Sequence, residues 1–391
     1  MAKRVGMEVS LAIAEAVKMA DVDVVAAYTI TPQTHIVERI AELVANGDLD
    51  AEYIPVESEH SAMSACLGSS GTGARTFTAT AGQGLELMHE VLYVASAMRL
   101  PIVMAVANRA LSAPLNVCGD QSDLMAVRDT GWIQIICENG QEAFDLTLCA
   151  FRTAEDNRVL LPVMVHLDGF YLTHVVEPIE FPTQEEVNRF LPPINYPLPL
   201  NPDKPLTMGT FAPTILYTEA KKAQEVNMLA SKKVILEHWE EFGKAFRRHY
   251  HPIEKYRTDG AKTLLMTMGS FGETAMTAVD KMRNEGKDVG LLKLRLWRPF
   301  PFEELYESIG NAQTLIVLVR ALSPGGPGGP AFSEIRSALY SQKVRPNIVG
   351  FVGGLGGRDL TVAEFEGMVK RGLEIVNTGA ENEYEMFGVR E

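Results

Sequence analysis

A regular alternation of two kinds of segment over residues 7–168 constrains the fold more than any other feature of the sequence. Short apolar runs of strand length, rich in Val, Ile, Ala and Met, are separated by longer stretches whose apolar residues follow helical spacing. The runs read DVVAAYTI, AEYIPV, RTFTAT, PIVMAVA, WIQIICE and LPVMVHL. Nearly continuous apolar strands that alternate with helices are typical of a parallel sheet covered on both faces. The sequence therefore predicts a doubly wound parallel sheet in this half.

In such a sheet, functional residues gather in the loops beyond the carboxyl ends of the strands. Here these loops begin at TITPQT (29–34), ESEHSA (57–62), TAGQGL (80–85) and NRALSAPLNVCGDQSDLMAVRDTG (108–131). The last loop is long for an α/β unit, and loops of that length are usually functional or mobile. We therefore expect a site at this edge of the sheet.

A second α/β series follows the first. The proline-rich stretch at 190–206 predicts an extended crossing segment, and a charged helix is expected over 217–246. From about 262 to 375, the runs KTLLMTMGS, VGLLKLRL, TLIVLVRA and NIVGFVGG predict strands of a smaller doubly wound domain. We expect the first domain, with its crossing segment and linker helix, over 1–240 and the second over 255–391.

The charge and hydropathy of the chain exclude several classes of partner. The net charge is −14 and the pI about 5.2, which disfavours binding to nucleic acid or to anionic membranes. The start resembles a signal peptide only superficially, because Glu8, Glu15 and Lys18 interrupt its apolar residues, and their spacing predicts an amphipathic helix. No apolar run approaches the roughly 18 residues that span a bilayer. A soluble, cytoplasmic protein is expected.

The cysteines and histidines predict no metal site. Cys66, Cys118, Cys137 and Cys149 lie far apart without a C-x-x-C pair, which fits neither a zinc site nor an iron–sulfur cluster. Sparse free cysteines suit a reducing cytoplasm, and we expect them to fill the core. His249 and His251, which flank Tyr250, have no carboxylate or cysteine neighbours at ligand spacing.

The stretch YIPVESEHSAMSA places Glu57, Glu59 and His60 where a loop turns into a helix. Acidic side chains at a helix start suit the positive end of its dipole, so ordinary capping is one interpretation. The other is that one carboxylate faces a pocket and transfers a proton.

Arg109 and Thr31 lie at the carboxyl ends of two predicted strands. A guanidinium at this position is suited to bind a carboxylate at two points, or it forms a salt bridge to Asp120 or Asp123. Thr31 precedes a proline, where a threonine is often only a turn or cap residue.

Three glycine-rich segments lack the spacing of a nucleotide-binding loop. GSSGTGAR (68–75) precedes a predicted strand, which is the wrong direction for a P-loop or a Rossmann turn, so helix-terminating glycines are expected. GGPGGP (325–330) and GGLGGRD (353–359) follow strands and are expected to shape tight turns. A free-standing nucleotide-binding protein is therefore disfavoured.

Taken together, several segments resemble the alpha subunit of 2-oxoacid:ferredoxin oxidoreductases, with pyruvate:ferredoxin oxidoreductase (pyruvate synthase) as the most similar type. They are AAYTITPQT, PVESEHSAMSA, TATAGQGLELM, ANRALSAP, GDQSDLMAVRDTGW, VMVHLDGF, RLWRPFPFEEL and GGLGGRDL. The resemblance implies a pyrimidine-binding domain of thiamine-diphosphate type followed by a transketolase C-terminal-like α/β domain. It implies oxidative decarboxylation of a 2-oxoacid, expected to be pyruvate, to acyl-CoA and CO2, with electrons passed to ferredoxin.

The same resemblance implies roles for four residues. Glu59 matches the carboxylate that hydrogen-bonds the aminopyrimidine N1′ of thiamine diphosphate, and Gln83 is expected to contact that cofactor. Arg109 matches the arginine that binds the substrate carboxylate, and Thr31 matches a threonine at the same end of the substrate. Glu57 and His60 are interpreted as supporting residues.

The resemblance also implies partner chains. The sequence lacks the GDG signature with a downstream Asn pair that holds the diphosphate and magnesium, and it lacks cysteines for clusters. We therefore expect a beta subunit to hold the diphosphate, [4Fe-4S] clusters on partner subunits, and further gamma and delta subunits. The chain is expected to be inactive alone.

Two departures from the family pattern affect the expected substrate. Thr29 stands where proline is common, and Cys118-Gly119-Asp120-Gln121 replaces a more usual His-rich sequence. Relatives that act on oxalate have a second cation in place of Thr31, which is absent here. An aromatic 2-oxoacid such as phenylglyoxylate, with another electron acceptor, therefore remains an alternative, as does a non-catalytic scaffold subunit.

Overall fold

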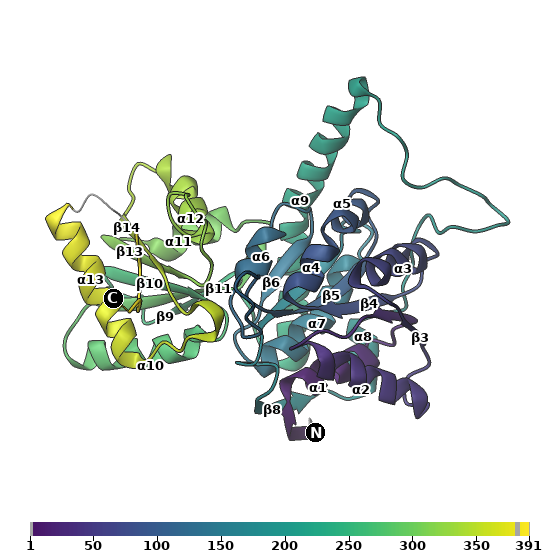
Figure 1. The fold of residues 1–391 in the computed structure, drawn as a ribbon, viewed down its shortest axis with the longest axis horizontal. Helices are drawn as coiled ribbons and strands as arrows, with labels where there is room; N and C mark the ends of the chain where they lie inside the picture. The colour runs from purple at the N-terminus through teal and green to yellow at the C-terminus, as the bar shows by residue number, and fades with distance from the viewer. Residues whose placement is uncertain (1–2, 380–383, 391) are drawn as a thin grey trace.

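Two sheets rich in parallel strands form the frame of the molecule in a computed structural model that describes residues 3–379 and 384–390. The first half of the chain builds the larger sheet, and the second half builds the smaller sheet beside it (Figure 1). The predicted pair of α/β units with parallel sheets is therefore confirmed. The exact division at 1–240 and 255–391 stays a prediction.

The larger sheet has the strand order β12-β6-β7-β5-β4-β2-β3, and the strands from β2 to β7 run parallel to one another. Their bounds are β2 (Val24–Ala27), β3 (Glu52–Pro55), β4 (Thr76–Thr80), β5 (Ile102–Asn108), β6 (Ile133–Ile136) and β7 (Val163–Asp168). β4 to β7 are buried along their whole length, as expected for strands that are apolar on both faces.

Helices cover both faces of this sheet. One face packs against α1 (Val9–Met19), α2 (Thr34–Ala45) and α7 (Gly140–Ala154), and the other against α3 (Glu59–Gly71), α4 (Gly82–Leu87) and α5 (His89–Ala97). α1 confirms the predicted amphipathic first helix. The sequence did not indicate the antiparallel pair of β1 (Lys3–Glu8) and β8 (Val176–Phe181) that flanks it. A short helix, α8 (Gln184–Phe190), follows β8.

The smaller sheet has the order β15-β14-β13-β10-β11-β9, in which only β9 is antiparallel to its neighbour among the described strands. Its strands are β9 (Ile253–Tyr256), β10 (Thr263–Met268), β11 (Val289–Leu294), β13 (Thr314–Val319), β14 (Asn347–Val352) and β15 (Tyr384–Met386). Its helices are α10 (Phe271–Asn284), α11 (Phe302–Ile309), α12 (Pro330–Tyr340) and α13 (Val362–Thr378), with a 3₁₀ turn, η1 (Leu355–Gly357).

One predicted strand of the second half is divided between the two sheets. The run VGLLKLRL was expected to be a single strand, but β11 ends at Leu294 and β12 (Leu296–Arg298) pairs antiparallel with β6 of the larger sheet. Arg295, between them, forms a buried ion pair with Glu142 of α7. The chain bends there because this arginine is bound to the first half of the molecule.

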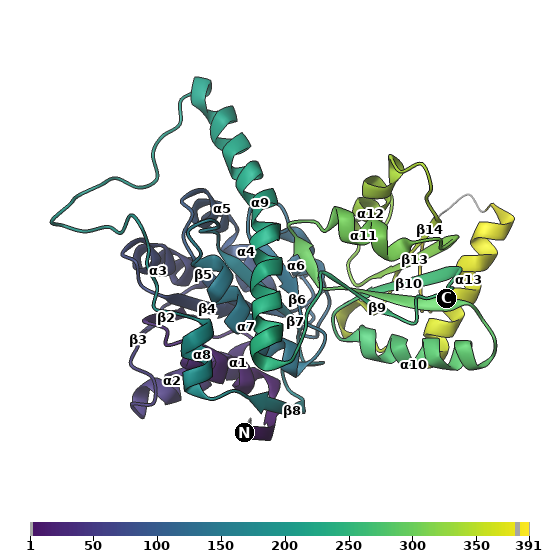
Figure 2. The same cartoon turned by 180° about the vertical axis from the view of Figure 1, so that it is seen from behind.

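The long helix α9 (Thr214–Phe246) connects the halves and crosses the back of the larger sheet (Figure 2). Its second half is buried, with Trp239 and Phe242 in the core, whereas residues 213–223 are exposed on all sides. The predicted extended segment before it is irregular and projects from the molecule (Figures 1 and 2). No helix in the described part of the chain combines the length and apolarity needed to cross a membrane.

Candidate functional site

The carboxyl edge of the larger sheet brings the four predicted residues into adjacent loops. Thr31 follows β2, Glu59 follows β3, Gln83 follows β4 and Arg109 follows β5. These strands are neighbours in the order β3-β2-β4-β5. A fold of this kind places ligands at that edge.

Glu59 is the buried member of the acidic cluster at the start of α3. Its side chain is 6% exposed, whereas Glu57 and His60 are exposed. The hydrogen-bond cap of the helix is Ser58, whose hydroxyl accepts the backbone N–H of Ser61 at 3.1 Å. Ser58 thus supplies the side-chain cap of α3, and Glu59 lies in the first turn of the helix, where its charge also suits the helix dipole.

The Glu59 carboxylate lies against a glycine that leaves room for it. A Cβ atom on Gly84 would come within 2.6 Å of Glu59 Oε1 and of Thr80 Oγ1. Such a distance is a severe overlap, so only glycine allows α4 to approach the carboxylate this closely. GQG in this loop therefore has a steric function at the site.

Polar atoms at the end of β4 and in α4 are buried without partners. The amide oxygen and nitrogen of Gln83, the hydroxyl of Thr80 and one carboxylate oxygen of Glu86 make no hydrogen bond within the described residues. Burial raises the pKa of Glu86, which His89 partly opposes. Buried polar groups are nearly always paired in native proteins, so a set of unpaired ones beside a carboxylate indicates a ligand site.

The guanidinium of Arg109 contacts backbone carbonyls. Its Nε donates to the carbonyl of Asn116 and its Nη1 to the carbonyl of Thr31, both at 3.1 Å. No ion pair to Asp120 or Asp123 is found in the described part of the chain, so the salt-bridge alternative is wrong. The guanidinium is buried and forms no ion pair with a carboxylate of the described residues, which leaves it able to bind one from a ligand.

Thr31 is exposed and close to Arg109 through its own carbonyl. The loop that contains it is positioned by Gln33, whose buried amide donates to the carbonyls of Ala79 at 2.7 Å and Tyr28 at 3.3 Å. Sequence reasoning missed Gln33, because nothing local distinguishes a buried glutamine from an exposed one.

Asp123 is a second residue with a structural part in the site that the sequence did not assign. Its carboxylate is completely buried and accepts the backbone N–H groups of Gly82 and Arg109. Burial raises its pKa to about 7, while the hydrogen bonds from Arg109, Asn108 and Gly82 oppose the shift. The motif GDQSD indicated this region of the chain, but it did not indicate which of the two carboxylates in the motif faces the site.

The second half of the molecule supports the long loop after β5. Arg320, 1% exposed, donates to the carbonyl of Gly119 at 2.7 Å and forms an ion pair with Asp168 at 2.9 Å. Gly357 of the GGLGGRD turn donates to the same carbonyl, and a Cβ there would come 2.4 Å from Cys118 Cβ. These glycines shape a turn that packs closely on the loop. Cys118 is half-buried in this loop and does not fill the core, unlike Cys66, Cys137 and Cys149.

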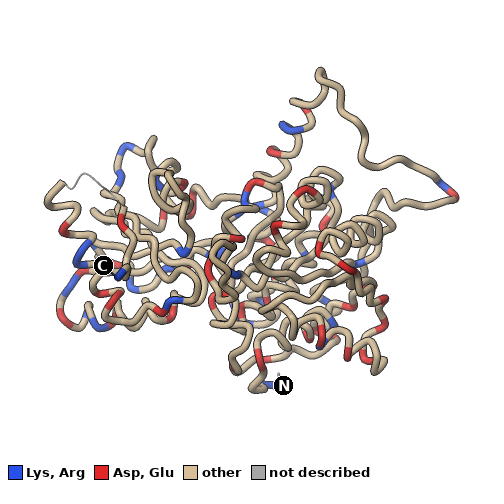
Figure 3. The backbone as a smooth tube through the Cα atoms, viewed as in Figure 1, with Lys and Arg blue, Asp and Glu red and all other residues tan. Residues whose placement is uncertain are grey.

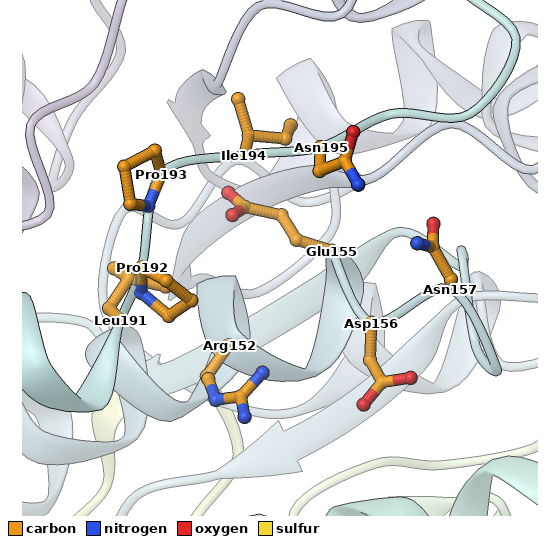
Figure 4. Close-up of a pocket in the computed structure, with 9 residues that line it drawn as sticks. All are labelled: Arg152, Glu155, Asp156, Asn157, Leu191, Pro192, Pro193, Ile194 and Asn195. Atoms are coloured by element: carbon orange, nitrogen blue, oxygen red, sulfur yellow. The ribbon is translucent and has the colours of Figure 1, made fainter.

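No group of three or more His, Cys, Asp or Glu side chains in the described residues could hold a metal ion. A cavity of about 270 Å³ lies at the opposite edge of the sheet, between the end of α7 and the proline-rich segment (Figure 4). Its charged residues each form an ion pair: Arg152 with Glu241, Glu155 with Arg75, and Asp156 with Arg158. These ion pairs account for the charges that line this cavity.

The sequence matches two family descriptions along most of its length. Residues 15–239 match "Pyruvate flavodoxin/ferredoxin oxidoreductase, thiamine diP-bdg", and residues 261–365 match "Pyruvate:ferredoxin oxidoreductase core domain II". Pyruvate synthase subunit PorA of Methanothermobacter thermautotrophicus is 50% identical over 92% of this chain and 93% of that protein. PorA of Thermotoga maritima is 47% identical over 92% and 91%. Ketoisovalerate oxidoreductase subunit VorA of Pyrococcus abyssi is 45% identical over 94% and 93%.

Solved structures share the fold. The 2-oxoglutarate:ferredoxin oxidoreductase of Magnetococcus marinus superposes with a TM-score of 0.73 at 19% identity, over 95% of this chain and 65% of that chain. A split-gene transketolase superposes with a TM-score of 0.55 at 13% identity, over 95% of this chain and 99% of that chain.

Proposed function

This chain belongs to the family of thiamine-diphosphate-binding pyruvate:flavodoxin and pyruvate:ferredoxin oxidoreductases, and from that premise we propose that it supplies the pyrimidine side of the cofactor site and the substrate-binding residues of such an enzyme. The reaction is the oxidative decarboxylation of a 2-oxoacid to acyl-CoA, with electrons passed to ferredoxin. The observation that carries this proposal is the buried Glu59 carboxylate beside unpaired polar atoms.

The residues present fit the aminopyrimidine end of thiamine diphosphate. That ring system presents nitrogen donors and acceptors. The Thr80 hydroxyl and the Gln83 amide are buried without partners, and Thr80 lies with Glu59 against Gly84. When bound, the cofactor supplies the carbon nucleophile and the electron sink for decarboxylation. Glu59 would hold the proton at the pyrimidine nitrogen, and Gln83 would orient the ring.

Arg109 and Thr31 would bind the substrate. A guanidinium forms paired hydrogen bonds with a carboxylate, and Arg109 has no carboxylate partner within the described part of this chain. Thr31 is exposed at the same place and would contact the same end of the 2-oxoacid. Binding through the carboxylate orients the keto carbon for attack without distinguishing the rest of the substrate.

The rest of the site would come from other chains. This polypeptide lacks the GDG signature for the diphosphate and magnesium, and we propose that a beta subunit provides it together with [4Fe-4S] clusters. Gamma and delta subunits, and a cytoplasmic location suited to a ferredoxin-linked complex, complete the proposal.

Pyruvate is the proposed substrate. Relatives that are about 50% identical over most of this chain are named pyruvate synthase subunits, which supports this proposal. A substrate panel on the purified complex tests the choice: pyruvate should give the highest kcat/KM, and a branched or aromatic 2-oxoacid giving the highest value would contradict it.

The function is tested by Glu59→Gln in the assembled complex. Loss of the carboxylate should lower kcat by about 100-fold or more, because proton transfer by a positioned group contributes on that order, while assembly is unchanged. The matched control is Glu185→Gln, an exposed carboxylate in the first turn of α8, which should have normal activity. Near-normal turnover by Glu59→Gln would exclude the mechanism.

A further inference from the structure

The carboxylate of Asp123 links two parts of the candidate site through four hydrogen bonds. Its Oδ2 accepts the backbone N–H of Gly82 at 3.0 Å and of Arg109 at 2.9 Å. Its Oδ1 accepts the side-chain amide of Asn108 at 2.8 Å and the backbone N–H of Leu124 at 2.8 Å. One buried group thus connects the end of β4, the end of β5 and the start of the short helix α6 (Ser122–Ala126).

The two loops bonded to Oδ2 have different functions in the site. Gly82 begins α4, where Gly84 lies against the Glu59 carboxylate and directly follows Gln83 in the chain. Arg109 begins the loop after β5, and its guanidinium donates to the carbonyl of Thr31. The single oxygen Oδ2 therefore fixes how far the cofactor side of the site lies from the substrate side.

We propose that Asp123 is a positioning residue that sets the spacing between the Glu59–Gln83 side of the site and the Arg109 guanidinium. The inference rests on the proposed function. Asp123 does not itself contact the reacting atoms. It acts through the two backbone amides bonded to its Oδ2.

Only an acceptor with two oxygens fits this position. Four N–H groups converge on Asp123, and an asparagine would present its own NH2 group to at least one of them. A carboxylate in this environment is costly to bury, and Asp120 nearby adds to the cost. A role restricted to packing would be met by an uncharged residue, so the charge indicates that the spacing of the four donors matters.

Close packing transmits a shift of either loop to the other. A Cβ on Gly82 would come 3.1 Å from Cδ of Arg109, so the arginine stem lies directly on this turn. The other face of the β5 end is also fixed, because Gly169 donates to the Asn108 carbonyl at 3.0 Å. Loss of the Asp123 acceptor should therefore move the guanidinium relative to Glu59.

The test compares Asp123→Asn with Asp145→Asn in the purified complex. Asp145 is equally buried and is bonded to Arg248 and Tyr250, away from the four site loops. We expect Asp123→Asn to raise KM for the 2-oxoacid roughly 10- to 100-fold, the order expected for misplacement of a binding group, and to lower kcat. Asp145→Asn should lower Tm with KM unchanged. A wild-type KM in Asp123→Asn, or an equal rise in both variants, would overturn the inference.

A milder variant keeps the test valid if Asp123→Asn does not fold. Asn108→Ala removes one of the four donors and should raise KM by a smaller factor, about 2- to 5-fold, and an unchanged KM would count against the proposal. Arg109→Ala separates this inference from the proposed function. If it raises KM while Asp123→Asn and Asn108→Ala do not, only the positioning role fails, and if it has no effect, the substrate site itself is wrong.

Discussion

Two long irregular segments of this chain differ in how the rest of the molecule contacts them. The loop over residues 109–121 is bonded by both halves, through Asp123 on one side and Arg320 on the other. The segment over residues 199–213 projects outward, and its residues 205–212 make no backbone hydrogen bonds within the described structure. Phe211 is 85% exposed. Length alone therefore does not identify a functional loop, whereas burial of its polar groups does.

Charge does not explain the difference between the two segments. Figure 3 shows charge on the projecting segment only at its tip, and its charged residues in the sequence are Asp203 and Lys204. The rest of the segment is uncharged. The bonded loop likewise includes few charges, but its Arg109 and Asp120 are buried and hydrogen-bonded. The two segments differ in whether their charged side chains are buried.

The largest expected effect follows from removal of Arg320. Arg320→Met leaves Asp168 buried without its ion pair and the Gly119 carbonyl without its side-chain donor. Breaking a buried pair by removing one partner costs about 3–5 kcal/mol, so the free energy of unfolding should fall by that order in urea denaturation of the isolated chain.

The control for Arg320→Met is Arg371→Ala, an arginine paired with Glu385 on the surface of the second half. Exposed pairs contribute little, so its unfolding midpoint should match wild type. Equal destabilisation by the two substitutions would show that the second half does not support the loop specifically.

The next effect concerns substrate binding by the bonded loop. Arg109→Ala in the complex should raise KM for the 2-oxoacid about 10- to 100-fold, which corresponds to the 1.5–3 kcal/mol typical of hydrogen bonds to charged groups. Arg109→Lys keeps the charge but loses the two-point geometry, so it should restore only part of the substrate affinity that Arg109→Ala loses. Full recovery by lysine would show that charge alone determines binding.

The sequence predicted the parts of this architecture that depend on local pattern. The apolar runs located β2 to β7, and the order of loops placed Thr31, Glu59 and Arg109 at one edge, because carboxyl ends of parallel strands meet there. The division of VGLLKLRL between two sheets was not predictable, since it depends on an ion pair between Arg295 and a residue far away in the chain, Glu142.

The supporting residues of the site were also beyond sequence reasoning. Asp120 and Asp123 both follow the same glycine within four residues, yet one bonds Ser122 and Gly356 and the other bonds Gly82 and Arg109. Only the three-dimensional positions of the donors distinguish them. Likewise, only the three-dimensional structure shows that Gln33 is buried.

Amide hydrogen exchange directly tests the contrast between the 109–121 loop and the projecting 199–213 segment. In the isolated chain, the amides of Ala110 and Gln121 should exchange slowly, because they donate to the carbonyls of Cys118 and Arg320. Amides in the 205–213 segment should exchange at nearly the rate of an unfolded peptide. Slow exchange in both segments would show that the projecting segment has structure of its own.

The smallest expected effect comes from the projecting end of α9, and the same helix supplies its control. Ile215 is 80% exposed, so Ile215→Ala should change the unfolding free energy of the isolated chain by no more than about 0.5 kcal/mol. Phe242 is fully buried at the other end of the helix. Phe242→Ala should lower the unfolding free energy by about 3–5 kcal/mol, because the substitution leaves a cavity in the core. A loss above about 1 kcal/mol for Ile215→Ala would mean that the start of the helix packs against this chain in solution, and the contrast between the two segments would then no longer hold.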